Sequence, residues 1–209
     1  MNNGPLIFFG IFFSLAFSWL GLVVANNLDA NFGGLGPYMD EATGLALPQQ
    51  MPGIARQGQR VYQDLGCASC HTQQVRREGF GGDVERGWGT RQSVARDYIH
   101  QSRVMVGSLR IGPDLMNVGD RIPLAEWHHQ QLYDPQINTP GSTMPPHAFL
   151  YETRRSMGTP SSNRIPLTGA HAPPEGYEVV PTRRAEVLVA YLLSLKTSYD
   201  LPESGSSHE

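Results

Sequence analysis

The beginning of the chain is apolar without interruption. Residues 5–25 read PLIFFGIFFSLAFSWLGLVVA, and Asp29 is the first charged side chain in the sequence. About 20 apolar residues are what a helix needs to cross the hydrocarbon layer of a membrane. We therefore predict a transmembrane anchor within residues 1–28.

A cleaved secretory signal is the alternative for this segment, because Val23-Val24-Ala25 resembles a small-residue cleavage site. The apolar run is longer than the core of a signal peptide, which is usually about 7–15 residues. No Lys or Arg precedes it, whereas a signal peptide begins with a basic region. These features favour a retained anchor. The positive-inside rule gives no orientation, since no basic residue lies close to either end of the span.

Two later segments carry apolar residues at helical spacing. A helix beginning at Gly53 and stopped by Gly66 would be amphipathic, and a second helix would span residues 183–196 with Thr182 as its N-cap. The first helix is predicted to bury one face made of Ile54, Gly58, Val61, Tyr62 and Leu65. The second is predicted to bury Val187, Leu188, Tyr191, Leu192 and Leu195.

The remaining segments are rich in Gly, Pro and polar residues and show no sustained period. We predict that residues 29–52 form an irregular linker, or a strap lying on a partner. Residues 53–199 would form the folded domain, within which residues 154–181 are predicted to be an irregular surface excursion. Residues 200–209 would form a polar tail.

The two cysteines of the chain belong to one decisive motif. The chain has two cysteines, and both lie in Cys67-Ala68-Ser69-Cys70-His71. The pattern C-x-x-C-H is the attachment site of a c-type haem. Each thiol can add to one vinyl group of the porphyrin, and His71 is then placed to ligate the iron.

Two other interpretations of the motif are weaker. A structural zinc site usually needs four Cys or His ligands, so remote histidines would have to complete it. A thioredoxin-type C-x-x-C follows a buried strand, whereas residues 59–65 are predicted to be helical. We therefore predict one covalently attached c-type haem.

The order of the elements resembles a class I cytochrome c domain: a helix, C-x-x-C-H, loops with short helices, and a terminal helix. The expected fold class is mainly α, with a single transmembrane helix followed by such a domain with long loops. In that family the first and last helices cross at a glycine and an aromatic residue, for which Gly58 and Tyr191 are the candidates. A missing side chain lets two helix backbones approach closely.

The same resemblance assigns residues around the haem. Gly112-Pro113-Asp114-Leu115 resembles the proximal loop, in which the proline carbonyl accepts a hydrogen bond from the proximal imidazole. Met144, in the sequence PGSTMPP, resembles the distal Met-Pro element and would be the second axial ligand of the iron. The other methionines considered are Met105, Met116 and Met157, and His147 is the nearest competing ligand.

The charged residues are unusual in one respect. Every basic residue except Lys196 is an arginine, and arginine suits bidentate contacts with carboxylates. Arg110 and Arg121 flank the proximal loop and are the candidates for pairing with the haem propionates. The net charge of −3, with arginines and acids interspersed, gives no support for nucleic-acid binding.

Over most of its length the chain closely resembles the membrane-anchored mono-haem cytochrome c subunit of cbb3-type haem-copper oxidases. The strings that carry this resemblance are HTQQVR (71–76), RGWGTR (86–91), SVARDY (93–98), RIGPDL (110–115), EWH (126–128), LYDP (132–135) and PGSTMP (140–145). Residues 154–181 match it less well.

This resemblance implies an electron-transfer subunit in the bacterial cytoplasmic membrane with its haem domain in the periplasm. Its expected partners are the catalytic subunit, which holds b-type haems and copper and reduces oxygen to water, and a further cytochrome c subunit as electron donor. No catalytic site is expected in this chain. The alternatives are the cytochrome c subunit of nitric oxide reductase, which shares the anchor and single haem, and a free-standing anchored electron shuttle.

Overall fold

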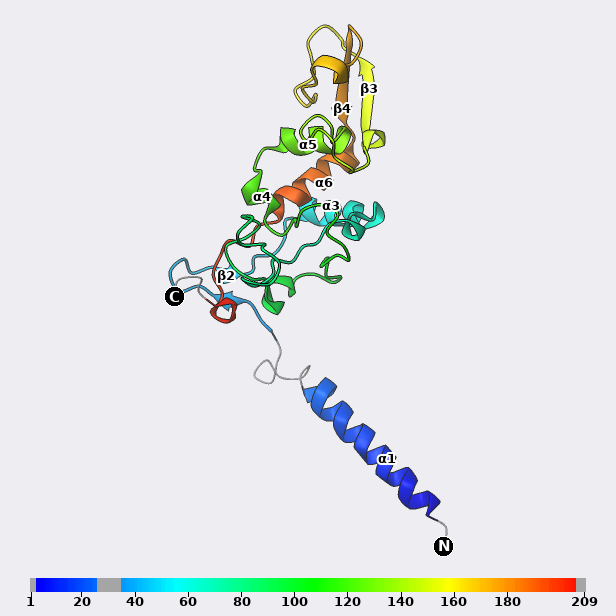
Figure 1. The fold of residues 1–209 in the computed structure, drawn as a ribbon, viewed down its shortest axis with the longest axis vertical. Helices are drawn as coiled ribbons and strands as arrows, with labels where there is room; N and C mark the ends of the chain where they lie inside the picture. Colours follow the sequence, from blue (N-terminus) through cyan, green and yellow to red (C-terminus); the bar gives the residue numbers. More distant parts are fainter. Residues whose placement is uncertain (1–2, 26–34, 206–209) are drawn as a thin grey trace.

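The computed structural model describes residues 3–25 and 35–205 (Figure 1). Its first element is helix α1 (Gly4–Trp19), which continues into a π-helical turn at Leu20–Val24. Together they make a 21-residue helix, Gly4–Val24, none of which is buried against the rest of the chain. By length and composition this helix can cross a membrane, and it suggests an N-terminal membrane anchor. Residues 1, 2 and 26–28 of the predicted anchor lie outside the described residues.

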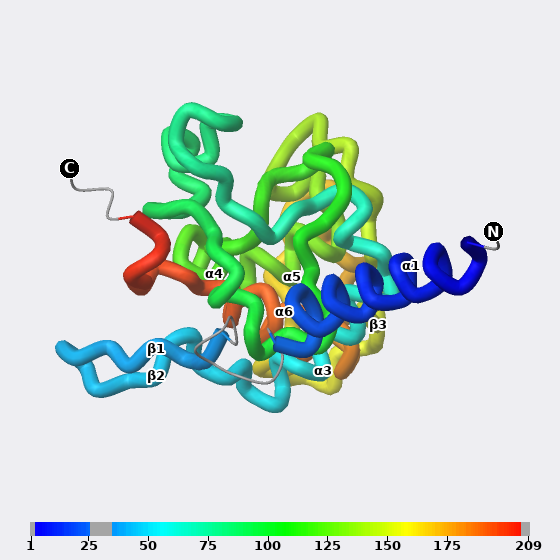
Figure 2. The backbone as a smooth tube through the Cα atoms, turned by 90° about the horizontal axis from the view of Figure 1, so that it is seen from below, coloured from blue at the N-terminus to red at the C-terminus, as the bar shows by residue number. Residues whose placement is uncertain are grey.

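The described part of the predicted linker is more ordered than expected. Strands β1 (Tyr38–Met39) and β2 (Ala46–Leu47) pair antiparallel and form the small hairpin seen in Figure 2. The guanidinium of Arg96 donates to the carbonyl of Gly36, and Nε2 of His100 lies 3.0 Å from the Pro48 carbonyl oxygen. This segment therefore lies on the chain's own domain. Residues 29–34 are outside the described residues.

The two predicted amphipathic helices are present. They are α3 (Gly53–Asp64) and α6 (Arg183–Ser194), and Thr182 caps α6 by accepting a bond of 3.5 Å from the Ala185 amide. One prediction on α3 is wrong, because Ile54 is 42% exposed and Ala55 is buried in its place. The reason is the position of the crossing with α6. Positions 55, 58 and 62 face α6, so position 54 is turned outward.

Helices α3 and α6 cross at Gly58. A Cβ atom built on Gly58 would lie 1.8 Å from the carbonyl oxygen of Val187 and 2.7 Å from Cβ of Tyr191. Beside this point the rings of Tyr62 and Tyr191 meet edge to face, with centroids 5.3 Å apart. The Gly58–Tyr191 crossing is therefore present as the sequence predicts.

Shorter elements complete the domain around α6. Helices α4 (Val118–Arg121) and α5 (Ala125–Tyr133) pack against it (Figure 1). Between residues 72 and 117 the chain is mostly irregular, with one short 3-10 turn at Ala95–Tyr98. This region is held by a buried ion pair in which Arg91 contacts both carboxylate oxygens of Asp97, at 3.0 and 2.8 Å.

The prediction that residues 154–181 form an irregular excursion is wrong at both of its ends. Strands β3 (Tyr151–Arg155) and β4 (Tyr177–Pro181) form a five-residue antiparallel ladder at the end of the molecule remote from α1 in Figure 1. Val179 and Val180 are buried, and so is Ile165 from the connecting loop. Val179 and Ile165 belong to the core that α6 also fills, and this burial stabilises the hairpin.

The described part of the predicted polar tail is also packed. Leu201 and Ser204 are buried around a 3-10 turn at Pro202–Ser204. Arg96 pairs with Glu203 at 2.5 Å. The tail is therefore part of the folded domain as far as residue 205, and residues 206–209 lie outside the described residues.

We expect Gly58→Ala to destabilise the domain, because the added methyl group forces the two helix backbones apart. Overpacking of this kind costs about 1–3 kcal/mol, and a contact with backbone atoms places the substitution at the upper end. The measurement is the midpoint of thermal unfolding in detergent. Gly53→Ala is the matched control, because its Cβ would have nothing within 4 Å. Equal midpoints for the two variants would show that the close approach is unimportant.

Candidate haem site

The two cysteines follow directly from the end of α3. Gly66 adopts the left-handed conformation (φ 69°, ψ 24°), which ends the helix and turns the chain into a 3-10 turn at Cys67–Ser69. The Ser69 hydroxyl donates to the Gly66 carbonyl at 2.7 Å and tightens this turn. Cys67 and Cys70 are both free thiols and half-buried. The turn therefore presents two thiols and His71 from one short segment.

His71 is held by the loop that the sequence predicts. Its Nδ1 lies 2.9 Å from the carbonyl oxygen of Pro113, so this nitrogen carries the proton and Nε2 is free to bind a metal. A Cβ on Gly112 would lie 2.2 Å from Cε1 of His71, so only glycine leaves room for the ring. The amide of Gly112 also donates to the Cys70 carbonyl at 3.0 Å.

A buried carboxylate joins the two loops. Asp114 is fully buried, and its Oδ2 accepts from the Thr72 hydroxyl at 2.6 Å and the Gln74 amide at 2.8 Å. Its Oδ1 accepts from the Met116 amide at 2.8 Å. The segment after the cysteines and the loop that holds His71 are thus fixed to the same side chain.

Arg110, a candidate for pairing with a haem propionate, is already bound by carboxylates of the chain. Its guanidinium forms an ion pair with the buried Asp83 and lies 3.6 Å from Asp114, and it also donates to the Gln74 carbonyl. Although burial opposes it, Arg110 lowers the pKa of Asp83. It also stacks on Trp88, 5.5 Å from the ring centroid. Arg110 therefore supports the loops from outside and is not among the residues that line the cavity described next.

A cavity of about 570 Å³ lies beside the cysteines. All of the predicted site residues except Arg110 line it, together with side chains from α3, α5 and α6. Those predicted residues are Cys67, Cys70, His71, Pro113, Leu115, Arg121 and Met144. Its size is in the range of cofactor sites.

Sequence reasoning missed one wall of this cavity. Trp127, His128, Gln131 and Leu132 line it, and these positions share one face of α5. The last three lie one, four and five positions after Trp127, which is the spacing of residues on one face of a helix. This spacing could have indicated the wall from the sequence, although the face mixes polar and apolar side chains. Tyr62 adds a ring from α3.

Met144 lies in a loop that is fastened to α5. The Leu132 carbonyl accepts from the His147 amide at 2.8 Å, and the Trp127 carbonyl accepts from the Asn138 side chain at 3.0 Å. The other methionines considered from the sequence lie elsewhere. Met105 and Met116 are buried away from the cavity lining, and Met157 is 94% exposed. His147 does line the cavity.

The cavity suits a group that is apolar over most of its surface and has a few polar points. Leu115, Leu188 and Leu192 give it apolar walls. Four buried polar atoms in its lining lack a hydrogen-bond partner within the described residues: the Tyr62 hydroxyl, Nε of Arg121, Oε1 of Gln131 and Nδ1 of His147. Such atoms are costly unless something occupies the cavity and binds them.

The protonation states of the motif also fit metal binding. Burial raises the pKa of the Cys67 thiol to about 11 and lowers the pKa of His71. At neutral pH Cys67 is therefore a thiol and His71 a neutral imidazole. A neutral imidazole is the form that binds a metal ion.

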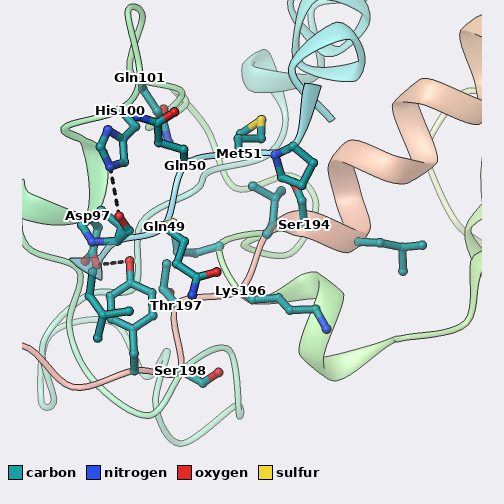
Figure 3. A pocket seen from close by; sticks show the side chains of 17 residues that line it. Gln49, Gln50, Met51, Asp97, His100, Gln101, Ser194, Lys196, Thr197 and Ser198 are labelled. Atoms are coloured by element: carbon teal, nitrogen blue, oxygen red, sulfur yellow. Dashed lines mark hydrogen bonds between the residues drawn. The ribbon is translucent and has the colours of Figure 1, made fainter. Parts of the chain in front are cut away.

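A second cavity, of about 660 Å³, lies between residues 47–52 and the segment that follows α6 (Figure 3). Its labelled side chains are mostly uncharged and polar, such as Gln49, Gln101 and Thr197. The charged groups in its lining are paired, Asp97 with Arg91 and Lys196 with Asp120. This cavity contains none of the predicted site residues.

Comparison with known families decides the identity of the domain. Residues 48–167 match the family model for the mono-haem subunit of cytochrome c oxidase, FixO. The chain belongs to this family. A search of curated proteins found no match.

Membership of the FixO family confirms the resemblance to the cytochrome c subunit of a cbb3-type oxidase. It implies one haem and a multi-subunit oxidase in which a catalytic subunit is a partner. The match includes the cysteine motif, the proximal loop and Met144. The anchor helix, β4 and α6 lie outside it.

We expect Asp114→Asn to weaken the junction of the two loops. An amide has one oxygen, so at least one of the backbone or hydroxyl donors now bound to Asp114 would face an NH₂ group. Leaving a buried donor unsatisfied costs about 1–3 kcal/mol. The midpoint of thermal unfolding measures this loss. Asp120→Asn, at a partly exposed ion pair with Lys196, is the control and is expected to change little; a similar small change for Asp114→Asn would contradict the assignment.

Proposed function

We propose that this chain is the electron-relay subunit of a cbb3-type oxidase and carries one covalently attached c-type haem in a class I cytochrome c domain. The observation that carries the proposal is the cavity that collects Cys67, Cys70, His71 and Met144 in a member of a mono-haem family. When bound, the haem would supply a single electron-accepting and electron-donating centre.

The chain's residues have distinct tasks in this proposal. Cys67 and Cys70 would form the thioethers, and His71, oriented by Pro113, would be the proximal ligand. Met144 would be the distal ligand, and ligation by His and Met closes both axial positions and raises the reduction potential. That arrangement suits electron transfer and disfavours binding of gases.

Arg121 is the basic residue best placed for a haem propionate. It lines the cavity, and its side chain donates to the Asp114 carbonyl while Nε has no partner within the described residues. Burial lowers the pKa of Arg121, so an anionic partner would stabilise its charge. Arg110 is not proposed for this role, because Asp83 already occupies its guanidinium.

The location follows from the anchor and the chemistry. The helix Gly4–Val24 would hold the chain in the bacterial cytoplasmic membrane, and thioether attachment of haem takes place outside the cytoplasm in the cytochrome c family. The domain would therefore face the periplasm. There it would receive electrons from a further cytochrome c subunit and pass them to the catalytic subunit with its b-type haems and copper.

The attachment is tested by replacing both Cys67 and Cys70 with Ala in the full chain. We expect covalent haem on this chain to be lost and oxygen consumption by the membranes to fall, while the anchor still inserts. Haem staining after denaturing electrophoresis and an oxygen electrode are the two measurements. Ser69→Ala, within the same motif, is the control and should retain haem. Undiminished haem staining in the double variant would refute covalent attachment; normal respiration without haem would refute the relay.

The axial pair is tested by Met144→His. We expect a six-coordinate haem with a lower reduction potential, because imidazole stabilises the oxidised iron more than a thioether does. Potentiometric titration of the haem-loaded chain measures the change. Met157→His is the matched control, since that methionine is 94% exposed. If both variants keep the wild-type potential, the distal ligand is another residue, and His147 would be tested next.

A further inference from the structure

The side chain of Gln131 is directed at the proposed distal ligand. Its Nε2 lies 3.9 Å from Sδ of Met144, a distance that allows a weak N–H···S hydrogen bond. Within the described residues this sulfur is the only hydrogen-bond partner of the Gln131 amide, and its Oε1 is buried without a partner. Among the residues that the structure describes, no oxygen binds this amide, so it is available to the thioether.

The backbone around this contact is fixed on both sides. Gln131 belongs to α5, and its helix face lines the cavity. The loop that carries Met144 is closed by Gln136, whose side chain donates to the Ser142 carbonyl at 2.7 Å and accepts from the Gly141 amide at 2.8 Å. The Met144 amide in turn donates to the Ser142 hydroxyl at 3.3 Å. The contact thus joins two segments that are already held in place.

We propose that Gln131 is a positioning residue that orients the Met144 thioether and raises the reduction potential of the haem. The inference rests on the proposed function, in which Met144 is the distal ligand. A thioether has two lone pairs on sulfur, and an N–H donor on one of them leaves the other for the iron. The donor withdraws electron density from the sulfur and points the positive end of its dipole towards the metal. Both effects disfavour the ferric state.

Replacing Gln131 by Leu removes the donor and leaves an apolar side chain of similar volume that is one atom shorter. We expect the haem to remain six-coordinate and the ratio of ferric to ferrous haem at a fixed ambient potential to rise by about two- to fivefold, which corresponds to the loss of one weak hydrogen bond. Gln131→Glu keeps the shape of the side chain. Above the pKa of the carboxyl group the side chain is an anion without a donor, so this variant should lower the reduction potential at least as much as Gln131→Leu. This second variant serves if the leucine variant incorporates haem poorly.

The matched control is Gln130→Leu, one residue earlier on the same helix. Gln130 donates to the Pro166 carbonyl at 2.7 Å and does not line the cavity. The Gln130→Leu substitution should leave the reduction potential unchanged even if it lowers the stability of the domain. The comparison therefore separates a structural effect on α5 from an effect on the Met144 thioether.

The experiment is a potentiometric titration of each full-length, haem-loaded variant, with the thioether-to-iron charge-transfer absorption of the ferric state recorded alongside. A lower potential in both Gln131 variants, with the potential of Gln130→Leu unchanged, supports the proposal, and a weakened charge-transfer band is expected to accompany it. Wild-type potentials in both Gln131 variants would overturn it. Absence of the band in the wild-type protein would instead show that Met144 is not the ligand, and the assignment of Gln131 would fail with it.

Discussion

The close approach of α3 and α6 at Gly58 is the constraint on which the site depends. The cysteine motif begins three residues after α3 ends, so the position of α3 sets the position of both thiols. Helix α6 contributes Leu188 and Leu192 to the cavity. A side chain at position 58 would separate the backbones of the helices and so move the thiols away from the opposite apolar wall. The missing Cβ therefore fixes the width of the cavity as well as the stability of the crossing.

Buried carboxylates hold together the irregular segment of the domain. The segment from residue 72 to residue 117 has little regular structure, so its backbone amides need other acceptors. Asp114 and Asp83 accept from the amides of Gln74, Met116 and Arg76. Arg110 lies between these two carboxylates and compensates part of their charge. The cost of burying the two acids is offset in part because together their side chains accept hydrogen bonds from three backbone amides.

The parts of this arrangement that sequence predicts are the local ones. The thiols, His71, the proline carbonyl and the Thr182 cap are each specified by a few adjacent residues, and the structure places them accordingly. Features that depend on residues far along the chain cannot be predicted in this way. Nothing adjacent to Arg110 marks Asp83, which precedes it by 27 positions, as its partner. The strands of the β3–β4 ladder are separated by a Gly-rich and Pro-rich loop, so neither strand indicates the other. The exposure of Ile54 depends on where α6 crosses α3, which the periodicity of a single helix does not specify.

The two sides of the cavity are built in different ways, and this difference has a functional consequence. On the His71 side, Nδ1 of His71 and both carboxylate oxygens of Asp114 have hydrogen-bond partners, and Gly112 leaves no room for a larger side chain. On the Met144 side, Gln131 and His147 each present a buried polar atom that has no protein partner within the described residues. Under the proposed function, the His71 side would fix the position of the iron. The Met144 side would leave the strength of the second ligand to a few polar contacts, so substitutions there would change the reduction potential without disturbing the fold.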